Sequence, residues 1–157
     1  MPIAVLIQTY EGPFRCRPQA LSCQRSALSG DIPKLTVKDF HQLKVWQKAH
    51  HLTLAVYQIT AGFPRDELYG LSSQLRRAAS SVAANLAEGS GRSGDAEFAR
   101  FCSIAMGSAS ELEYHLLLAK DLKLIGPKDH EVLSWRAVEV KRMLAGLLVK
   151  LRADRLR

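Results

Sequence analysis

Hydrophobic residues recur at alternating spacings of four and three from residue 39 onward, which is the pattern of amphipathic helices. The pattern predicts helices at residues 39–61, 66–90, 93–124 and 128–153, with Asp39 as the N-cap of the first and glycine or proline between them. No such period is sustained before residue 39, where four of the six prolines occur. Residues 1–38 are therefore expected to be an irregular or disordered extension, and residues 39–157 the folded domain.

Each predicted helix has an apolar stripe that should face a common core, and short turns make consecutive helices antiparallel. We therefore expect an all-α, up-down-up-down four-helix bundle. Small residues at 78–84 and 105–110 predict that the second and third helices approach closely. The stripes are Val45, Ala49, Leu52, Val56 and Ile59; Leu68, Leu71, Leu75, Ala78, Val82 and Leu86; Phe101, Ala105, Ser108, Leu112, His115, Ala119 and Leu122; and Val132, Trp135, Val138, Leu144, Leu147 and Leu151.

Composition agrees with a helical protein, since 47% of the 157 residues are hydrophobic but only 7% are aromatic. Three cysteines are too few and too scattered for a disulfide framework. No segment approaches the roughly 20 apolar residues of a membrane span, and the first residues lack the basic region of a signal peptide. We expect a cytoplasmic protein with no membrane partner.

The net charge of +7 is unevenly distributed. Residues 141–157 hold six basic residues and one acidic residue, residues 1–38 hold five and two, and the segment between them is nearly neutral. A basic end is typical of a surface that neutralises phosphates. The candidate nucleic-acid contacts are Arg76, Arg77, Lys141, Arg142, Lys150, Arg152, Arg155 and Arg157.

The patterns of metal and catalytic sites are missing from the sequence. A dinuclear carboxylate site in a bundle needs Glu-x-x-His on two helices, and that motif does not occur. The glycine-rich residues 89–94 follow a predicted helix and lack the Lys-Ser/Thr of a phosphate-binding loop. His115 lies four residues after Glu111, the spacing of a structural pair on a helix. We expect no enzyme, no metal, no cofactor and no catalytic residue.

Four polar residues, Arg77, Asn85, Glu88 and Glu111, lie beside the small-residue segments. Buried charges are tolerated only when they are paired and hydrogen-bonded. We therefore expect these four side chains to form a network between helices or between subunits.

Short motifs follow one another in a distinctive order along the predicted helices. They are Phe40-x-x-Leu43-x-Val45-Trp46-Gln47, Gln74-Leu75-Arg76-Arg77-Ala78-Ala79, Asn85-x-Ala87-Glu88-Gly89, Glu97-Phe98-x-x-Phe101 and Glu111-Leu112-Glu113. The ordered set resembles the bacterial four-helix-bundle proteins encoded in 23S rRNA intervening sequences, historically called S23 ribosomal proteins. The resemblance implies a homopentamer around a central channel, with no enzymatic activity. It also implies a relation to the accessory variability protein of diversity-generating retroelements, a basic pentamer that works with RNA and a reverse transcriptase.

These observations lead to one function and one alternative. The first is a non-enzymatic homo-oligomer that binds structured RNA or DNA through phosphate contacts with little reading of bases. The alternative is a scaffold that docks a protein partner, such as a reverse transcriptase, with the basic residues serving only solubility.

Overall fold

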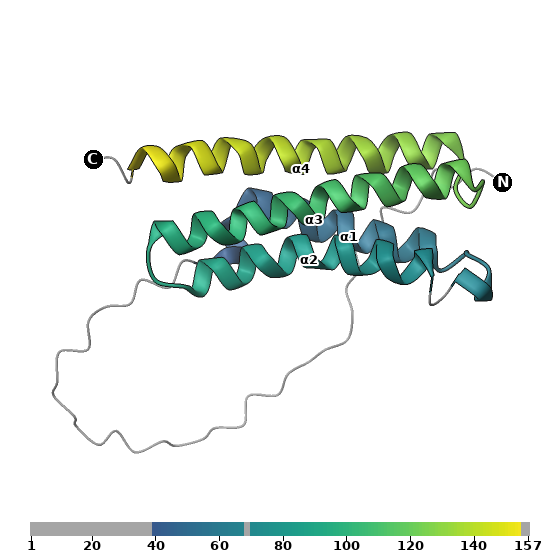
Figure 1. The fold of residues 1–157 in the computed structure, drawn as a ribbon, viewed down its shortest axis with the longest axis horizontal. Helices are drawn as coiled ribbons and strands as arrows, with labels where there is room; N and C mark the ends of the chain where they lie inside the picture. Colours follow the sequence, from purple (N-terminus) through teal and green to yellow (C-terminus); the bar gives the residue numbers. More distant parts are fainter. Residues whose placement is uncertain (1–38, 68–69, 155–157) are drawn as a thin grey trace, which may run out of the picture. The chain divides into compact units, whose positions relative to one another are not determined.

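The computed structural model describes residues 39–67 and 70–154 of the chain (Figure 1). Every regular element within these residues is helical. The predicted extension at residues 1–38 lies outside the described residues, as do Leu68, Arg155 and Arg157. The elements are the 3-10 helices η1 (Phe40–Gln42) and η2 (Arg65–Glu67) and the α-helices α1 (Lys44–Thr60), α2 (Leu71–Gly91), α3 (Asp95–Asp121) and α4 (Pro127–Asp154).

The four α-helices form an antiparallel bundle. Helix α1 packs against α2 and α4, and α3 packs against the same two helices. Within the described residues, the diagonal pairs α1 with α3 and α2 with α4 make no contacts, which is the arrangement of a square of four helices. The start of α1 and the C-terminal turns of α4 lie at one end, together with the turn between α2 and α3 (Figure 1). The predicted all-α four-helix fold is confirmed.

The first helix begins five residues later than predicted. Asp39 caps η1 instead of α1, because its Oδ1 accepts a hydrogen bond of 3.0 Å from the backbone N–H of His41. Leu43 then has extended backbone angles (ψ 110°), which separate η1 from α1. Helix α2 also begins later than predicted, at Leu71, whose backbone N–H donates to Oε2 of Glu67 over 3.1 Å.

The predicted apolar stripes of α1 and α2 largely face the core. Val45, Ala49, Leu52 and Val56 of α1 are buried, and so are the predicted residues of α2 from Leu71 to Leu86. The stripe of α3 differs, because Ser108 and His115 are only half-buried and Leu122 is exposed. The buried residues of α3 are Phe98, Phe101, Cys102, Ala105, Ala109, Leu112, Leu116 and Ala119.

The predicted stripe of α4 is wrong in its first half. Trp135 is 62% exposed and Val132 is 50% exposed, whereas Leu133 and Ala137 are buried. The buried positions Leu133, Ala137, Val140, Leu144 and Leu151 follow the regular spacing of a core-facing helix. Trp135 and Val132 therefore lie on the solvent side of α4, and the small Ala137 takes a core position.

Three local features hold the helices in place. Helices α2 and α3 approach closely at Gly89, where an added Cβ would lie 2.7 Å from the Cβ of Phe101. Thr53 links α1 to α2, since its Oγ1 lies 2.9 Å from the carbonyl oxygens of both Ala49 and Ala79. Helix α3 ends in a Schellman motif with Lys123 in the left-handed region (φ 59°).

Within the part of the chain that the structure describes, none of the helices combines the length and the apolar character needed to cross a membrane.

Candidate nucleic-acid interface

The two predicted contacts on α2 have partners within the bundle. Arg76 is half-buried, and its Nε donates to Oγ1 of Thr60 over 2.8 Å. Its guanidinium also lies over the ring of Tyr57, 5.1 Å from the ring centre. Arg77 is exposed, but it bonds to Gln74 and forms an ion pair with Glu111 of α3. Both guanidinium groups therefore hold helices together in this structure.

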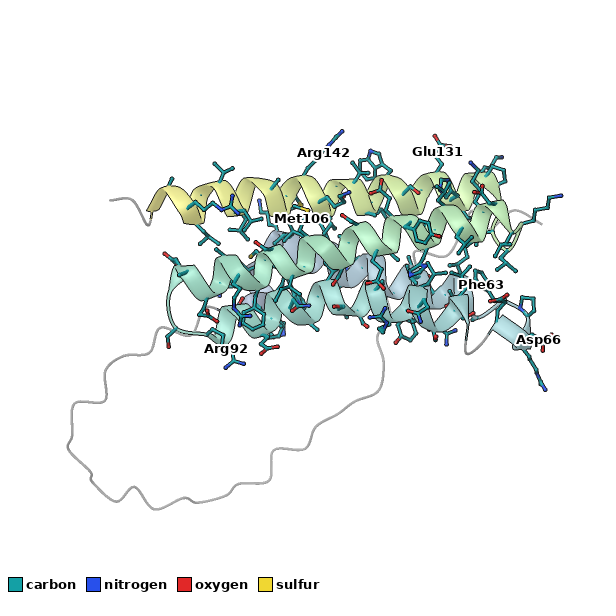
Figure 2. All side chains as sticks on the ribbon, viewed as in Figure 1. Phe63, Asp66, Arg92, Met106, Glu131 and Arg142 are labelled. Atoms are coloured by element: carbon teal, nitrogen blue, oxygen red, sulfur yellow. The ribbon has the colours of Figure 1, made fainter. Side chains whose placement is uncertain are left out.

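The predicted contacts on α4 divide into paired and unpaired cations. Lys141 forms an ion pair of 2.8 Å with Glu113 of α3. Arg142, Lys150 and Arg152 are exposed, and the ion pairs that form among residues 39–67 and 70–154 use other cations. Figure 2 shows Arg142 pointing away from the bundle on the outer side of α4. The predicted contacts that are exposed and unpaired within the described residues thus lie on the C-terminal half of this helix.

The expected polar network is brought together only in part. Arg77 and Glu111 meet across the α2–α3 contact, where the Oε1 of Glu111 also lies 3.6 Å from the Nε2 of His115. The expected pair of Glu111 and His115 is therefore present at a distance longer than a hydrogen bond. The Nδ1 of His115 is buried and has no partner among the described residues.

Asn85 and Glu88 lie further along α2 and make separate contacts. The side-chain amide of Asn85 donates to the backbone oxygen of Ser81 over 2.7 Å, and the hydroxyl of Ser81 lies 2.9 Å from that of Ser108 on α3. Glu88 pairs with Arg92 of its own helix over 2.5 Å. Of the four predicted residues, Arg77 and Glu111 thus link α2 to α3, whereas Asn85 and Glu88 bond to residues of α2 and its C-cap.

Aromatic and imidazole rings gather at the start of α1, and the sequence reasoning missed them. Phe40, His41, Trp46 and His50 form a continuous series of ring contacts, which we call the ring ladder. Trp46 is half-buried and packs against the core, and Phe40 and His50 are also half-buried, whereas His41 is exposed. In the sequence, Trp46 follows Phe40 by six residues and precedes His50 by four. The η1 turn is what brings Phe40 and His41 beside Trp46.

Within residues 39–67 and 70–154, no group of three or more His, Cys, Asp or Glu side chains is arranged to hold a metal ion. Cys102 is buried in the core. The described part of the chain therefore offers cations, rings and apolar surface as its recognition chemistry.

Comparison with known proteins gives the family. The profile of the 23S rRNA-intervening sequence proteins matches residues 41–146, which is more than half of the chain. The chain belongs to this family. The family resemblance that the ordered motifs predicted is thereby confirmed.

A solved structure of a 23S rRNA-intervening sequence relative has the same fold. It is the crystal structure of a protein of unknown function from the S23 ribosomal protein family of Bacteroides thetaiotaomicron VPI-5482. The two chains are 22% identical with a TM-score of 0.62, and the similarity covers 66% of this chain and 94% of that chain. No curated protein matches the sequence.

The match to the 23S rRNA-intervening sequence family includes some of the candidate cations and excludes others. Arg76, Arg77, Lys141 and Arg142 lie inside the matched residues, whereas Lys150 and Arg152 lie beyond them. Lys150 and Arg152, two of the three predicted contacts on α4 that are exposed and unpaired within the described residues, therefore lie outside the part of the chain that the family profile matches.

The outer side of α3 and α4 is rich in exposed apolar residues. Tyr114 is 60% exposed on α3, and Trp135 and Val149 are exposed on α4. A groove of about 420 Å³ lies between α3 and the first half of α4 and is lined by Ser110, Glu113, Tyr114, Leu117, His130 and Ser134. Exposed large apolar residues that gather in this way are typical of protein–protein contact surfaces.

Proposed function

We propose that this member of the 23S rRNA-intervening sequence family is a non-enzymatic homo-oligomer that binds structured RNA or DNA through phosphate contacts. One observation carries the nucleic-acid part: Arg142, Lys150 and Arg152 are exposed and unpaired within the described residues, in a segment with six basic residues and one acidic residue. Unpaired cations can neutralise phosphates without first breaking an internal ion pair.

Two groups of exposed apolar residues support self-association. One is the outer side of α3 and α4, with Tyr114, Trp135 and Val149, and the other is on α1, with Leu54 and Tyr57. Two different patches on one chain suit head-to-tail contact between copies, and such contacts close into a ring when the rotation permits. A ring agrees with the pentamer that the family resemblance implied, and it would repeat the basic end of α4 around its axis.

Filter binding of a structured RNA across a salt series tests the nucleic-acid proposal. We expect the logarithm of the affinity to fall linearly with the logarithm of the salt concentration, because bound cations displace counterions from phosphates. The double variant Lys150→Gln/Arg152→Gln should lower the slope by about one for each phosphate that a subunit no longer neutralises. A shallow slope that this variant leaves unchanged would reject phosphate binding by the basic end.

A matched double variant controls for net charge. Lys120→Gln/Lys123→Gln removes two exposed cations near the C-terminal end of α3, at the opposite end of the bundle. It should leave the affinity and the slope close to those of the unchanged protein. An equal loss in both double variants would mean that overall charge, and not the basic end, governs binding.

The apolar side of α3 and α4 favours the second candidate function, a scaffold for a protein partner such as a reverse transcriptase. Trp135 and Tyr114 are residue types that are enriched at protein interfaces. An oligomer that keeps its size but binds RNA weakly at every salt concentration would favour the scaffold.

A further inference from the structure

The ring ladder lies at the start of the bundle. Its first two rings belong to η1, and none of the η1 residues is buried. The ring of His41 stacks on Phe40 with 4.0 Å between centres. Trp46 meets both of these rings edge-on, at 4.8 Å and 5.2 Å. On its other side Trp46 is nearly parallel to His50, with 5.1 Å between centres and an angle of 6°.

Polar contacts fix the exposed end of the ladder. The Nδ1 of His41 lies 2.8 Å from Oδ1 of Asp39, and Gln47 donates to the backbone oxygen of His41 over 2.8 Å. The His41 side chain nevertheless remains 66% exposed. Because one face of its ring rests on Phe40, the solvent-exposed surface includes the opposite face. An exposed ring that is already ordered loses little further conformational entropy when a flat ligand stacks on it.

The ladder is next to cationic groups that suit a phosphate chain. Lys44, the first residue of α1, is exposed directly after η1. Lys150 and Arg152 lie toward the same end of the bundle, on the last turns of α4, which runs antiparallel to α1 and extends past its start (Figure 1). The carboxylate of Asp39, the acidic residue within the ladder's own turn, is engaged by His41.

We propose that the ring ladder is a stacking site for unpaired nucleobases. The proposal rests on the proposed function and sharpens it: the ligand is an RNA or DNA with a single-stranded segment, whose phosphates follow the basic end of α4. Rings that offer a face to stacking bases, beside a basic surface, are the recurring means of binding single strands. In the ladder this ring is His41, because Phe40, Trp46 and His50 are half-buried. Bases in a duplex already stack on one another, so their faces are closed to the ladder.

Filter binding of two RNAs to the full-length protein tests this site. The probes are a short oligoadenylate and a blunt RNA duplex of equal length. We expect the double variant His41→Ala/His50→Ala to bind oligoadenylate at least about five-fold more weakly, the lower end for loss of one base–ring stack. Its affinity for the duplex should not change, because the phosphate contacts remain.

Fluorescence gives a readout that a structural role would not change. Trp46 and Trp135 are the two tryptophans of the chain, so Trp135→Phe leaves Trp46 as the only indole. Oligoadenylate should quench Trp46 emission in this variant, and the duplex should not. His130→Ala is the matched control, since His130 lies at the opposite end of the bundle beside Ser134.

The outcomes separate the two proposals. If both RNAs bind with the same steep salt dependence and the ladder variant changes neither affinity, the stacking proposal is overturned and the proposed function stands. If neither RNA binds, both proposals fail. Circular dichroism of the ladder variant verifies the fold; if the helices are lost, the single variant His41→Ala, which alters only an exposed side chain, replaces it.

Discussion

Gly89 lies where α2 comes closest to the phenylalanine side chains of α3. A Cβ at this position would be 2.7 Å from Cβ of Phe101 and 3.0 Å from Cδ2 of Phe98. Because a Cβ is fixed to its backbone, α3 would have to move to make room. We expect Gly89→Ala to lower the free energy of unfolding by about 1–3 kcal/mol, measured by urea denaturation.

Gly107 supplies the control for that prediction. It lies in the middle of α3, and an added Cβ would meet no atom within 4 Å. Gly107→Ala should raise the free energy of unfolding by about 0.5–1 kcal/mol, since alanine restricts the unfolded chain. Similar effects of the two substitutions would contradict the close approach at Gly89.

The hydroxyl of Thr53 is a buried link between α1 and α2. Thr53→Val keeps the shape of the side chain but removes the hydrogen bond to Ala79. We expect a loss of about 1 kcal/mol in the free energy of unfolding, the usual contribution of one hydrogen bond. Ser103→Ala, which removes an exposed hydroxyl bonded only within α3, should change stability much less.

The pKa of the Asp39 carboxyl is lowered from its usual value of 3.8 by the hydrogen bond from the His41 side chain and then by that from the His41 backbone. A carboxylate with a lowered pKa in the folded state stabilises that state above pH 3.8, and this contribution is lost as the pH falls through the lower value. An NMR titration should show Asp39 below 3.8 and a shift back toward 3.8 in His41→Ala. An unchanged pKa in that variant would show that the bond is absent in solution.

Lys123, just after the end of α3, has a backbone conformation that lysine rarely adopts. Lys123 has φ 59°, in the C′ position of a Schellman motif, where glycine is preferred. The motif is closed by a bond of 2.9 Å from the N–H of Leu124 to the oxygen of Ala119. Lys123→Gly should therefore raise the melting temperature, corresponding to about 0.5–1 kcal/mol.

A helix-interior control distinguishes this effect from the loss of a lysine. Lys120→Gly removes the same side chain in the last turn of α3, where the backbone is still helical, and should destabilise the protein by up to about 1 kcal/mol. If both glycine substitutions destabilise, the left-handed conformation of Lys123 does not persist in solution.

The existence and order of the four helices could be predicted from sequence, but several starts could not. The apolar spacing repeats over the whole length of a helix, so it predicts the buried side without exact helix ends. Leu52 and Leu75 are accordingly buried in the core, as the spacing predicts. The start of α1 depends on Asp39 capping a 3-10 turn and on stacking between Phe40 and His41, which spacing does not encode. The spacing predicts Trp135 in the core, but the buried stripe of α4 runs through Leu133 and Ala137, and Trp135 is exposed.

The candidate site was predictable as a charge distribution and less so as a geometry. Sequence placed the basic surplus at the end of α4, where Arg142, Lys150 and Arg152 are exposed. It could not show that Lys141 is held by a carboxylate of α3, because the partner Glu113 is 28 residues away in the chain. The family profile and the shared fold identify the bundle, whereas the packing of the helices determines which carboxylates the basic side chains meet.

Substitution of Trp135 tests whether the protein self-associates through the outer side of α3 and α4. It is 62% exposed on α4 and makes no contribution to the buried core. We expect Trp135→Ser to lower the molar mass measured by light scattering. The circular dichroism spectrum and the free energy of unfolding of the monomer should remain close to those of the wild-type protein. The physical reason is the loss of an apolar anchor of the kind that dominates protein interfaces.

Leu122→Ser is the control for Trp135. Leu122 is also exposed, at 54%, but it belongs to the turn after α3 and not to the outer side of the α3–α4 pair. Its replacement should leave the molar mass unchanged. If light scattering shows the wild-type protein to be a monomer at every protein concentration, the self-association proposal is wrong.

The antiparallel path of an even number of helices has a practical consequence for handling the protein. The chain enters the bundle at Asp39 and leaves it at Asp154, and both points lie at one end (Figure 1). A purification tag or fluorescent fusion joined close to either point is therefore attached on the side that carries the free cations and the ring ladder. A tag inserted beside Gly62, in the turn between α1 and α2, would leave that side uncovered.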